Sequence, residues 1–232
     1  MLKTKKLIIF GLEDFAQIAY EYFSFDSEYE VVAFTVNRDY VTKDSLFGLP
    51  VVPFEELTEK FSPDDHFLYA AITYGKLNEV RQKICNQVKE KGYKLASYIS
   101  SKAFVWKNVT LGEHVFIFEN NTIQPFAAIG NNVVLWSGNH IGHHSKIADN
   151  CFISSHVVLS GWTRVGHNSF IGVNSAIANN INIGSECWIG HNSTISKDIP
   201  DLSITKVDSV EIKPLNKESL FKILSLHSKK RN

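Results

Sequence analysis

Histidine is the residue type in this chain whose placement most clearly suggests chemistry. Nine histidines are present, and two of them, His143 and His144, are adjacent. An imidazole titrates near neutral pH and can take a proton from an attacking amine or hydroxyl, so an accessible histidine is a candidate general base. Spacing alone leaves His143, His140 and His156 as candidates for that base.

The candidate bases lie within a six-residue repeat that must position them. From Val105 to Ile195 a Val, Leu or Ile recurs every six residues without a break. This period predicts a parallel β-helix, in which each repeat forms one short strand and one turn. A sandwich of ordinary short strands would not hold one register for so long. With three strands in a turn, about eighteen residues form a coil, and the repeat stacks roughly five triangular coils.

Two smaller regularities accompany the repeat. Glycine often follows the aliphatic residue, as at Gly142, where the absence of Cβ would ease the corner. Small residues two positions before the aliphatic residue, such as Ser145, would fill the inside corners. His143, His167 and His191 hold the same position of the repeat and should therefore lie on three different edges of the triangle.

The composition restricts the class of protein. The chain has 232 residues, with 24 basic and 24 acidic side chains, and its length fits two domains. This balance gives no electrostatic footprint for nucleic acid or for an anionic membrane. The sequence shows no signal peptide and no apolar run of transmembrane length, so we expect a cytoplasmic protein. Three scattered cysteines without CxxC spacing should be reduced packing residues: Cys85, Cys151 and Cys187.

The first hundred residues alternate between strand and helix patterns. Strands are predicted at residues 7–10, 31–34, 49–52 (an edge piece), 67–72 and 95–99, and helices at 15–23, from about 53 and at 76–91. Leu77, Val80, Ile84 and Val88 should form the buried face of the last helix. Such alternation predicts an open parallel sheet, which binds ligands beyond the carboxyl ends of its strands. The binding rim would then comprise residues 11–14, 35–39 and 73–75.

The register stops after Pro200, and residues 202–214 look irregular. A terminal helix is predicted at residues 216–226, with Asn216 as its cap and with Leu220, Ile223 and Leu224 on one side. Such a helix would cover the open end of the coils. The predicted domains are therefore an α/β domain at residues 1–100, a β-helix at 101–200 and a tail at 201–232.

Three segments carry a resemblance to a known family: residues 48–52, residues 71–72 with the basic helix start at 76–81, and residues 141–147. Together with the two-part layout, they make the chain similar to the sugar O-acyltransferase and sialic acid O-acetyltransferase family. That family includes bacterial N-acetyltransferases of nucleotide-linked amino sugars. The resemblance implies a left-handed β-helix, a homotrimer, and acetyl-CoA or another acyl-CoA in the groove between neighbouring β-helices. It implies a nucleotide-linked sugar on the α/β domain and no metal.

The resemblance also assigns roles to residues. It places the general base on His143 and an oxyanion-binding amide one coil further on, at Gly161. Many relatives carry an acidic residue directly after the base, where this chain has His144, which we include in the predicted catalytic set. Either a carboxylate reaches His143 from a neighbouring subunit, or the base works without one. The predicted path of coenzyme A runs past Asn179 and Gly190 to Lys206, although the Gly-x-Pro-Ala-Lys segment of many relatives is replaced here by residues 203–207.

The predicted nucleotide site departs furthest from the family. Of the usual glycine-rich turn with a histidine, only Gly11 remains, and Glu13 and Asp14 would repel a pyrophosphate. The usual acidic residues after the second strand are replaced by residues 35–39. We predict substrate contacts at Gly11, Asn37, Arg38 and Tyr74.

These observations predict an acyl-CoA-dependent N-acyltransferase that acts on a UDP-, dTDP- or GDP-linked deoxyamino sugar. One alternative is O-acetylation of a sugar hydroxyl. A second is a zinc enzyme resembling the gamma-type carbonic anhydrases, whose histidine pair five residues apart this chain lacks. A third is a non-catalytic trimeric scaffold.

Overall fold

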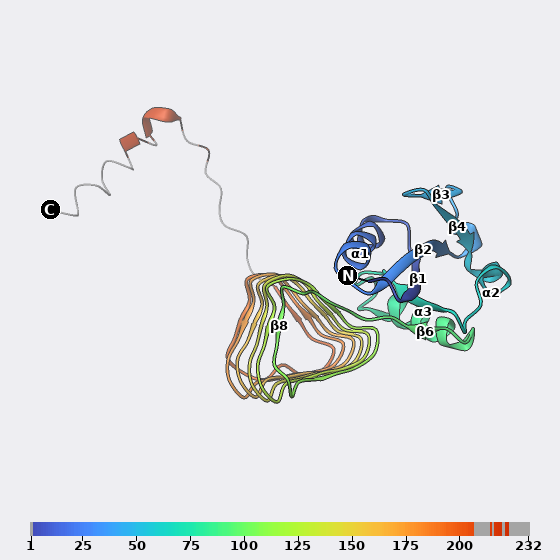
Figure 1. Cartoon of the computed structure of the whole chain (residues 1–232). Coiled ribbons are helices and arrows are strands. Elements are labelled where there is room, and N and C mark those ends of the chain that lie inside the picture. The colour runs from blue at the N-terminus through green and yellow to red at the C-terminus, as the bar shows by residue number, and fades with distance from the viewer. Residues whose placement is uncertain (1, 207–213, 215, 220, 223–232) are drawn as a thin grey trace.

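The computed structural model describes residues 2–206, 214, 216–219 and 221–222. It has two parts of different architecture, a layered α/β part and a triangular stack of coils, which appear in blue to green and in green to orange in Figure 1. This arrangement confirms the predicted fold class of a small α/β unit followed by a parallel β-helix.

A parallel sheet forms the core of the α/β part. Its strands are β1 (Lys5–Phe10), β2 (Tyr29–Val36), β4 (Leu49–Pro53), β5 (His66–Ala70) and β6 (Lys94–Leu95), in the order β4-β2-β1-β5-β6. A short strand that we did not predict, β3 (Ser45–Leu46), pairs antiparallel with β4 at the edge. The helical elements are α1 (Asp14–Phe25), η1 (Arg38–Tyr40), η2 (Phe54–Glu56), α2 (Leu57–Lys60) and α3 (Glu79–Glu90). β1 is central, and Leu7, Ile8 and Ile9 are fully buried because elements cover both faces of the sheet.

The helix predicted from Lys76 begins three residues later. Lys76, Leu77 and Asn78 have φ angles of 48°, 49° and 69°, and α3 starts at Glu79. Left-handed backbone is unfavourable for lysine and leucine, so contacts with other segments must help to hold it. The amide of Asn78 donates to the Ser169 carbonyl, and the amide of Asn168 donates to the Leu77 carbonyl, each at 3.4 Å.

The coils have three faces, each a ladder of two-residue parallel strands. The first face consists of β7 (Tyr98–Ile99), β10 (Phe116–Ile117), β13 (Val134–Leu135), β16 (Phe152–Ile153), β19 (Phe170–Ile171), β22 (Trp188–Ile189) and β24 (Ile204–Thr205). The second face consists of β8 (Phe104–Val105), β11 (Thr122–Ile123), β14 (His140–Ile141), β17 (Val158–Leu159), β20 (Ala176–Ile177) and β23 (Thr194–Ile195). The third face consists of β9 (Thr110–Leu111), β12 (Ala128–Ile129), β15 (Lys146–Ile147), β18 (Arg164–Val165) and β21 (Asn182–Ile183).

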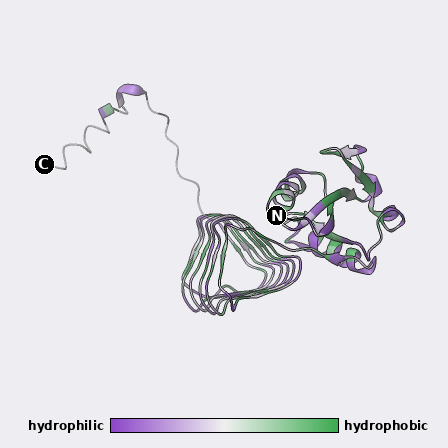
Figure 2. Cartoon of the chain, in the orientation of Figure 1, coloured by the Kyte–Doolittle hydropathy of each residue, from purple (hydrophilic) through white to green (hydrophobic). Residues whose placement is uncertain are grey.

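The predicted register is confirmed, but its two ends differ from the prediction. Ile99 already belongs to the coils, because β7 pairs with β10 and only β6 joins the α/β sheet. Residues 202–214 are not wholly irregular, since Ile204 pairs with Trp188 and β24 extends the first face. Figure 2 shows apolar and polar residues interleaved along the coils, as the six-residue pattern requires.

The corners turn at a position other than the one predicted. From Leu111 to Ile189, the residue three places after each aliphatic residue of the repeat has positive φ, and it is most often asparagine, as at Asn132 (55°) and Asn150 (61°). Asparagine tolerates this conformation better than most side chains do. Gly142 has a different role, because a Cβ there would lie 2.6 Å from the Gly161 nitrogen of the next coil. Glycine after the aliphatic residue therefore permits close stacking of coils.

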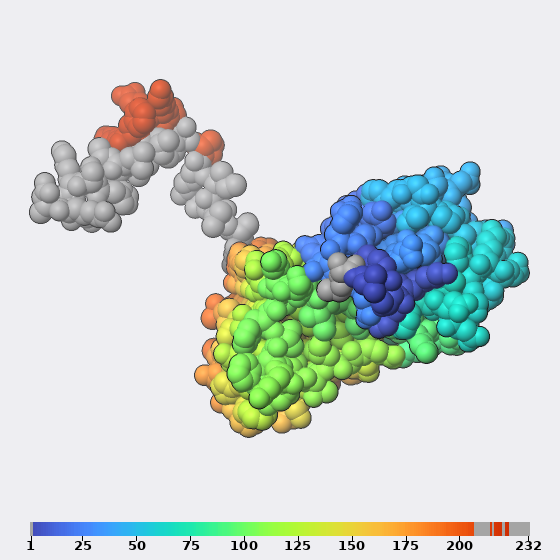
Figure 3. All heavy atoms as spheres, in the orientation of Figure 1, coloured from blue at the N-terminus to red at the C-terminus, as the bar shows by residue number. Residues whose placement is uncertain are grey.

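The α/β part packs against the first face of the coils (Figure 3). Aromatic rings dominate the contact, with Phe15 and Tyr69 placing their centroids 5.7 and 5.2 Å from that of Phe116. The Tyr98 hydroxyl donates to Asp26 Oδ2 at 2.7 Å and ties α1 to β7. These contacts join the α/β sheet and the coils into one apolar core, so the first face is covered from Tyr98 to Phe170.

Part of the predicted tail helix is described. Residues 217–219 and 221–222 are helical, and Asn216 Oδ1 accepts a hydrogen bond from the Ser219 N–H at 2.8 Å, as expected of a cap. Its predicted apolar side chains Leu220, Ile223 and Leu224 lie outside the described residues. None of the helices in the described part of the chain has the length and apolarity needed to cross a membrane.

Candidate active site

His143 lies at the edge between the second and third faces, in the turn from β14 to β15. Its side chain is exposed, and its ring lies over Gly161 of the next coil. A Cβ built on Gly161 would be 2.6 Å from His143 Cε1 and 2.7 Å from Nε2. Among the described residues the Gly161 N–H has no acceptor. A ring nitrogen and an unpaired amide thus adjoin one another at this edge.

The backbone around His143 is fixed by the coils on both sides. The side chain of Gln124 in the preceding coil accepts a hydrogen bond from the His143 N–H at 2.9 Å. The His143 carbonyl accepts one from the Trp162 N–H of the following coil, also at 2.9 Å. This rigidity suits a catalytic group, which must keep its geometry during the reaction.

His144 contacts His143 through ring nitrogens. The two Nδ1 atoms are 3.1 Å apart, and the rings are nearly perpendicular at 86°. The His144 ring is stacked between Phe126 and Trp162, with centroid distances of 4.6 and 4.2 Å. Stacked coils place these three side chains in one column, so the orientation of His144 is set independently of His143.

The predicted coenzyme residues divide between two edges. Asn179 is exposed and lies on the same edge as His143, one coil beyond Gly161. The Gly161 carbonyl accepts a hydrogen bond from the neighbouring Asn180 N–H at 3.1 Å. Gly190 follows β22 at the edge between the first and second faces, and Lys206 follows β24 there. The Gly190 N–H is already used, because it donates to the Thr205 carbonyl at 3.2 Å.

The other candidate histidines lie away from His143. His167 follows β18 and His191 follows β22, so the three equivalent histidines lie on three edges, as predicted. His140 is a half-buried strand residue of the second face, and His156 packs over Gly138 in the turn from β16 to β17. Within the described ranges, no three His, Cys, Asp or Glu side chains converge as a metal site would require.

The predicted substrate residues occupy the carboxyl ends of three neighbouring strands. Gly11 ends β1 with φ 133°, and its N–H donates to the Thr35 carbonyl at 2.9 Å. Asn37 follows β2, and its buried Oδ1 has no partner among the described residues. Arg38 turns outward and pairs with Glu56 at 2.6 Å with its side chain 58% exposed.

Tyr74 follows β5 but serves the contact between the two parts. Its ring centroid is 4.6 Å from that of Phe170 and 5.1 Å from that of Phe152 on the first face. Tyr74 is still 39% exposed, so this packing leaves part of the residue accessible at the rim, and its contact with substrate stays a prediction.

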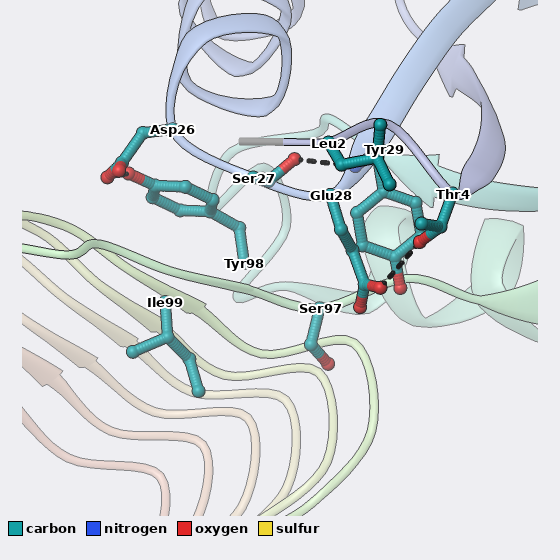
Figure 4. A pocket seen from close by; sticks show the side chains of 9 residues that line it. All are labelled: Leu2, Thr4, Asp26, Ser27, Glu28, Tyr29, Ser97, Tyr98 and Ile99. Carbon is teal, nitrogen blue, oxygen red and sulfur yellow. Dashed lines mark hydrogen bonds between the residues drawn. The ribbon is translucent and has the colours of Figure 1, made fainter.

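A hollow of about 470 Å³ lies at the other end of the strands from the predicted rim, near the amino ends of β1 and β2. Figure 4 shows Tyr98 pointing toward Asp26 and Thr4 bonded to Glu28 at its wall. These polar groups satisfy one another, and the hollow lies far along the strands from the predicted rim. We assign it no role in the site.

Arg81 is a buried residue that the helical pattern missed. We predicted Val80 on the buried face of α3, yet Val80 is 37% exposed and Arg81 is fully buried. Its Nη1 donates to the Ile72 and Thr73 carbonyls at 3.2 and 2.9 Å, which tethers the loop after β5. Its Nε and Nη2 donate to Asn132 and to the Cys151 carbonyl of the coils. The sequence did not predict this burial, because a charged residue on a helix is usually exposed.

His114 is the second buried group that we did not predict. Its Nε2 accepts the Ala70 N–H at 2.9 Å, so Nδ1 carries the proton and donates to Asn132 Oδ1 at 2.9 Å. Burial lowers the pKa of His114 to about 3. Burial likewise raises the pKa of the neighbouring Cys85 thiol to about 12, and His114 has no free nitrogen to accept its proton. Cys85, His114 and Asn132 therefore do not form a nucleophilic triad.

The low pKa of His114 makes stability depend on pH. The unfolded chain binds this proton near pH 6.5, whereas the folded protein resists it down to about pH 3. Stability is thus fully present above pH 6.5, and the free energy of unfolding should fall by up to about 1.4 kcal/mol per unit as pH decreases between these values. His114→Asn, which does not titrate and suits the φ of 55°, should be less stable but flatter in urea titrations over this range. Equal slopes for both proteins would contradict this assignment.

Gly161→Ala should disable the site with little effect on folding. The new Cβ would overlap the His143 ring, and the exposed ring must swing away, because the overlap involves a side chain and not the backbone. A misplaced base typically costs about 100-fold in rate. Catalytic rate and melting temperature measured on the same preparation would test this expectation, and a variant with full activity would show that the ring does not need its place over Gly161.

A comparison with known protein families identifies part of the repeat. The bacterial transferase hexapeptide model (six repeats) matches residues 126–161, which include the His143 edge. No curated protein matches the chain by sequence. This match lies within the repeat and agrees with the six-residue period of the sequence.

Several solved structures are similar to this chain over most of its length. The acetyltransferase domain of PglB from Neisseria gonorrhoeae FA1090 has a TM-score of 0.77 and 25% identity, covering 87% of this chain and 96% of that one. A histidine-to-asparagine variant of perosamine N-acetyltransferase from Caulobacter crescentus, solved with CoA and GDP-perosamine, has a TM-score of 0.77 and 23% identity, covering 88% and 94%. WeeI from Acinetobacter baumannii AYE has a TM-score of 0.67 and 18% identity, covering 87% and 96%. The chain thus shares its two-part architecture with the PglB acetyltransferase domain and with perosamine N-acetyltransferase, which agrees with the resemblance drawn from its sequence.

Proposed function

We propose that this protein is an acetyl-CoA-dependent N-acetyltransferase acting on a nucleotide-linked amino sugar. The observation that carries the proposal is the placement of His143 Nε2 over Gly161, whose N–H is unpaired among the described residues. Support comes from the shared architecture of perosamine N-acetyltransferase, which was solved with CoA and GDP-perosamine and with a histidine replaced by asparagine or alanine.

In this proposal the sugar amine attacks the thioester carbonyl of acetyl-CoA directly. The carbonyl oxygen becomes an oxyanion, which the Gly161 N–H stabilises by hydrogen bonding in the turn. His143 Nε2 accepts a proton from the amine, which leaves an amide nitrogen when the adduct collapses. Collapse breaks the carbon–sulfur bond and expels the CoA thiolate, which takes up the proton that His143 accepted and leaves the imidazole neutral again. No covalent acyl-enzyme is formed.

The remaining predicted residues divide between the two substrates. Residues 1–100 would hold the nucleotide sugar through Gly11, Asn37, Arg38 and Tyr74, and residues 101–200 would hold acetyl-CoA. Asn179 continues the His143 edge toward later coils, and Gly190 and Lys206 would meet the far end of the coenzyme as residues 201–232 begin. Lys206 is exposed and would contact a phosphate as a point charge.

We propose a homotrimer with the coenzyme groove between neighbouring coils. The first face is covered by the α/β part, whereas the second face and its edges expose large apolar side chains. These are Phe104 (52% exposed), Phe126 (58%), Val158 (41%) and Trp162 (51%). Several large exposed apolar side chains on one side of a protein are typical of an interface between subunits. We place the reaction in the cytoplasm, because all three cysteines are free thiols.

The test is CoA thiol release from acetyl-CoA with a panel of UDP-, dTDP- and GDP-linked amino sugars. We expect turnover with one of them and none with the matching sugar that carries a hydroxyl in place of the amine. Mass spectrometry of the product should show one added acetyl group on nitrogen. Thiol release only with hydroxyl acceptors would overturn N-transfer, and no release with any acceptor would overturn the transferase assignment.

A further inference from the structure

The chain places a second histidine where it can control the first. His143 has two ring nitrogens, and the structure gives them different surroundings. Nε2 lies over Gly161, whereas Nδ1 lies 3.1 Å from Nδ1 of His144. A neutral imidazole has one N–H and one lone pair, and the hydrogen bond made by one nitrogen decides which form the ring takes.

We infer that His144 is a positioning residue that accepts the Nδ1–H of His143 at its own Nδ1. The inference rests on the proposed function, because only this form leaves the lone pair of His143 on Nε2, over Gly161. His144 then carries its own proton on Nε2. When His143 takes a proton from the substrate, its Nδ1–H still donates to His144, and the hydrogen bond becomes charge-assisted and stronger.

The aromatic column gives His144 the fixed direction that this role needs. Its ring is nearly parallel to those of Trp162 and Phe126, at 10° and 24°. The two stacks fix the plane of the His144 ring, and in that plane its Nδ1 lies 3.1 Å from His143 Nδ1. A 180° flip about χ2 would keep the stacks but put Cδ2 in place of Nδ1, so the hydrogen bond to His143 favours the observed orientation. The backbone N–H of His144 also bonds to the Pro125 carbonyl at 3.2 Å. Trp162 and Phe126 carry no ionisable group. Of the three rings in contact with His144, only that of His143 can therefore gain or lose a proton.

Two substitutions separate the hydrogen bond from the stack. His144→Asn keeps an acceptor, because asparagine Oδ1 is attached to Cγ as histidine Nδ1 is, but it lacks the ring. His144→Phe keeps a ring for stacking but lacks the acceptor. Both residue types already occupy equivalent corners with positive φ, Asn180 at 61° and Phe126 at 65°, so neither should strain the backbone.

We expect His144→Phe to lower kcat by about tenfold or more, with the KM for acetyl-CoA unchanged. His144→Asn should keep kcat within about threefold of the wild type. The opposite order, with the phenylalanine variant active and the asparagine variant impaired, would show that His144 acts only by stacking. Equal activity of both variants and the wild type would also overturn the inference.

The protonation of the His143 ring can be measured without enzymatic activity, so this inference can be tested separately from the proposed function. In protein labelled with ¹⁵N-histidine, the His143 signals should show a protonated Nδ1 and an unprotonated Nε2 at pH about 8. His144→Phe should shift them toward the opposite form, and His144→Asn should not. A protonated Nε2 in the wild type would overturn the inference even if the enzyme is active, whereas the expected spectrum without turnover would count against the proposed function alone.

Discussion

His143→Ala should lower kcat for transfer to the amino sugar by about 10²- to 10⁴-fold, the usual contribution of a positioned general base. The side chain is exposed, so its removal should leave the fold intact. The KM for acetyl-CoA should change little, because the ring acts on the proton of the amine and not on the coenzyme. Steady-state thiol release at several substrate concentrations separates these two quantities.

A matched control is available in the repeat itself. His167→Ala removes an exposed histidine from the same repeat position on another edge, and its activity should equal that of the wild type. Raising the pH should restore part of the rate of His143→Ala, because hydroxide and water then collect the proton from an amine that is already nucleophilic. A His143→Ala variant with wild-type kcat, or an equal loss in His167→Ala, would contradict the assignment of the base.

The repeat could be predicted because its period is a direct consequence of the fold. Each inward aliphatic residue from Val105 to Ile195 ends a strand, since an inside corner recurs at a fixed interval. Its ends were harder to place. Ile99 fits the register but adjoins the α/β strand β6, and Ile204 pairs with Trp188 across sixteen residues instead of eighteen. A shortened last coil leaves no six-residue signal.

The site could be predicted as far as it follows from stacking of coils. Eighteen residues separate His143 from Gly161, and the structure brings them into contact. The roles of His144, Tyr74 and Arg81 depended on packing between side chains distant in sequence, which no local pattern records. His144 occupies the position of an expected acid, yet it meets His143 because Phe126 and Trp162 fix its ring.

Arg81→Lys should destabilise the protein by about 3 kcal/mol, although the change keeps the charge. The Arg81 guanidinium is fully buried, and its five N–H donors meet five oxygens, with no carboxylate among those acceptors. An ammonium has three donors on a differently shaped head, so at least two buried carbonyl or amide oxygens would lose their partner. Each such loss typically costs about 1–3 kcal/mol. Urea titration of both proteins at one protein concentration measures the difference.

The same substitution should also weaken binding of the nucleotide sugar, because Arg81 joins two parts of the proposed site. It holds the Ile72 and Thr73 carbonyls at the end of β5 and, through Cys151, the coils that carry His143. Loss of this tether should raise the KM for the nucleotide sugar more than the KM for acetyl-CoA. Arg164→Lys, on the exposed third face, is the control and should change stability by less than about 0.5 kcal/mol. If Arg81→Lys were as stable as this control, the buried network would not hold the two parts together, and the rim would need another source of order.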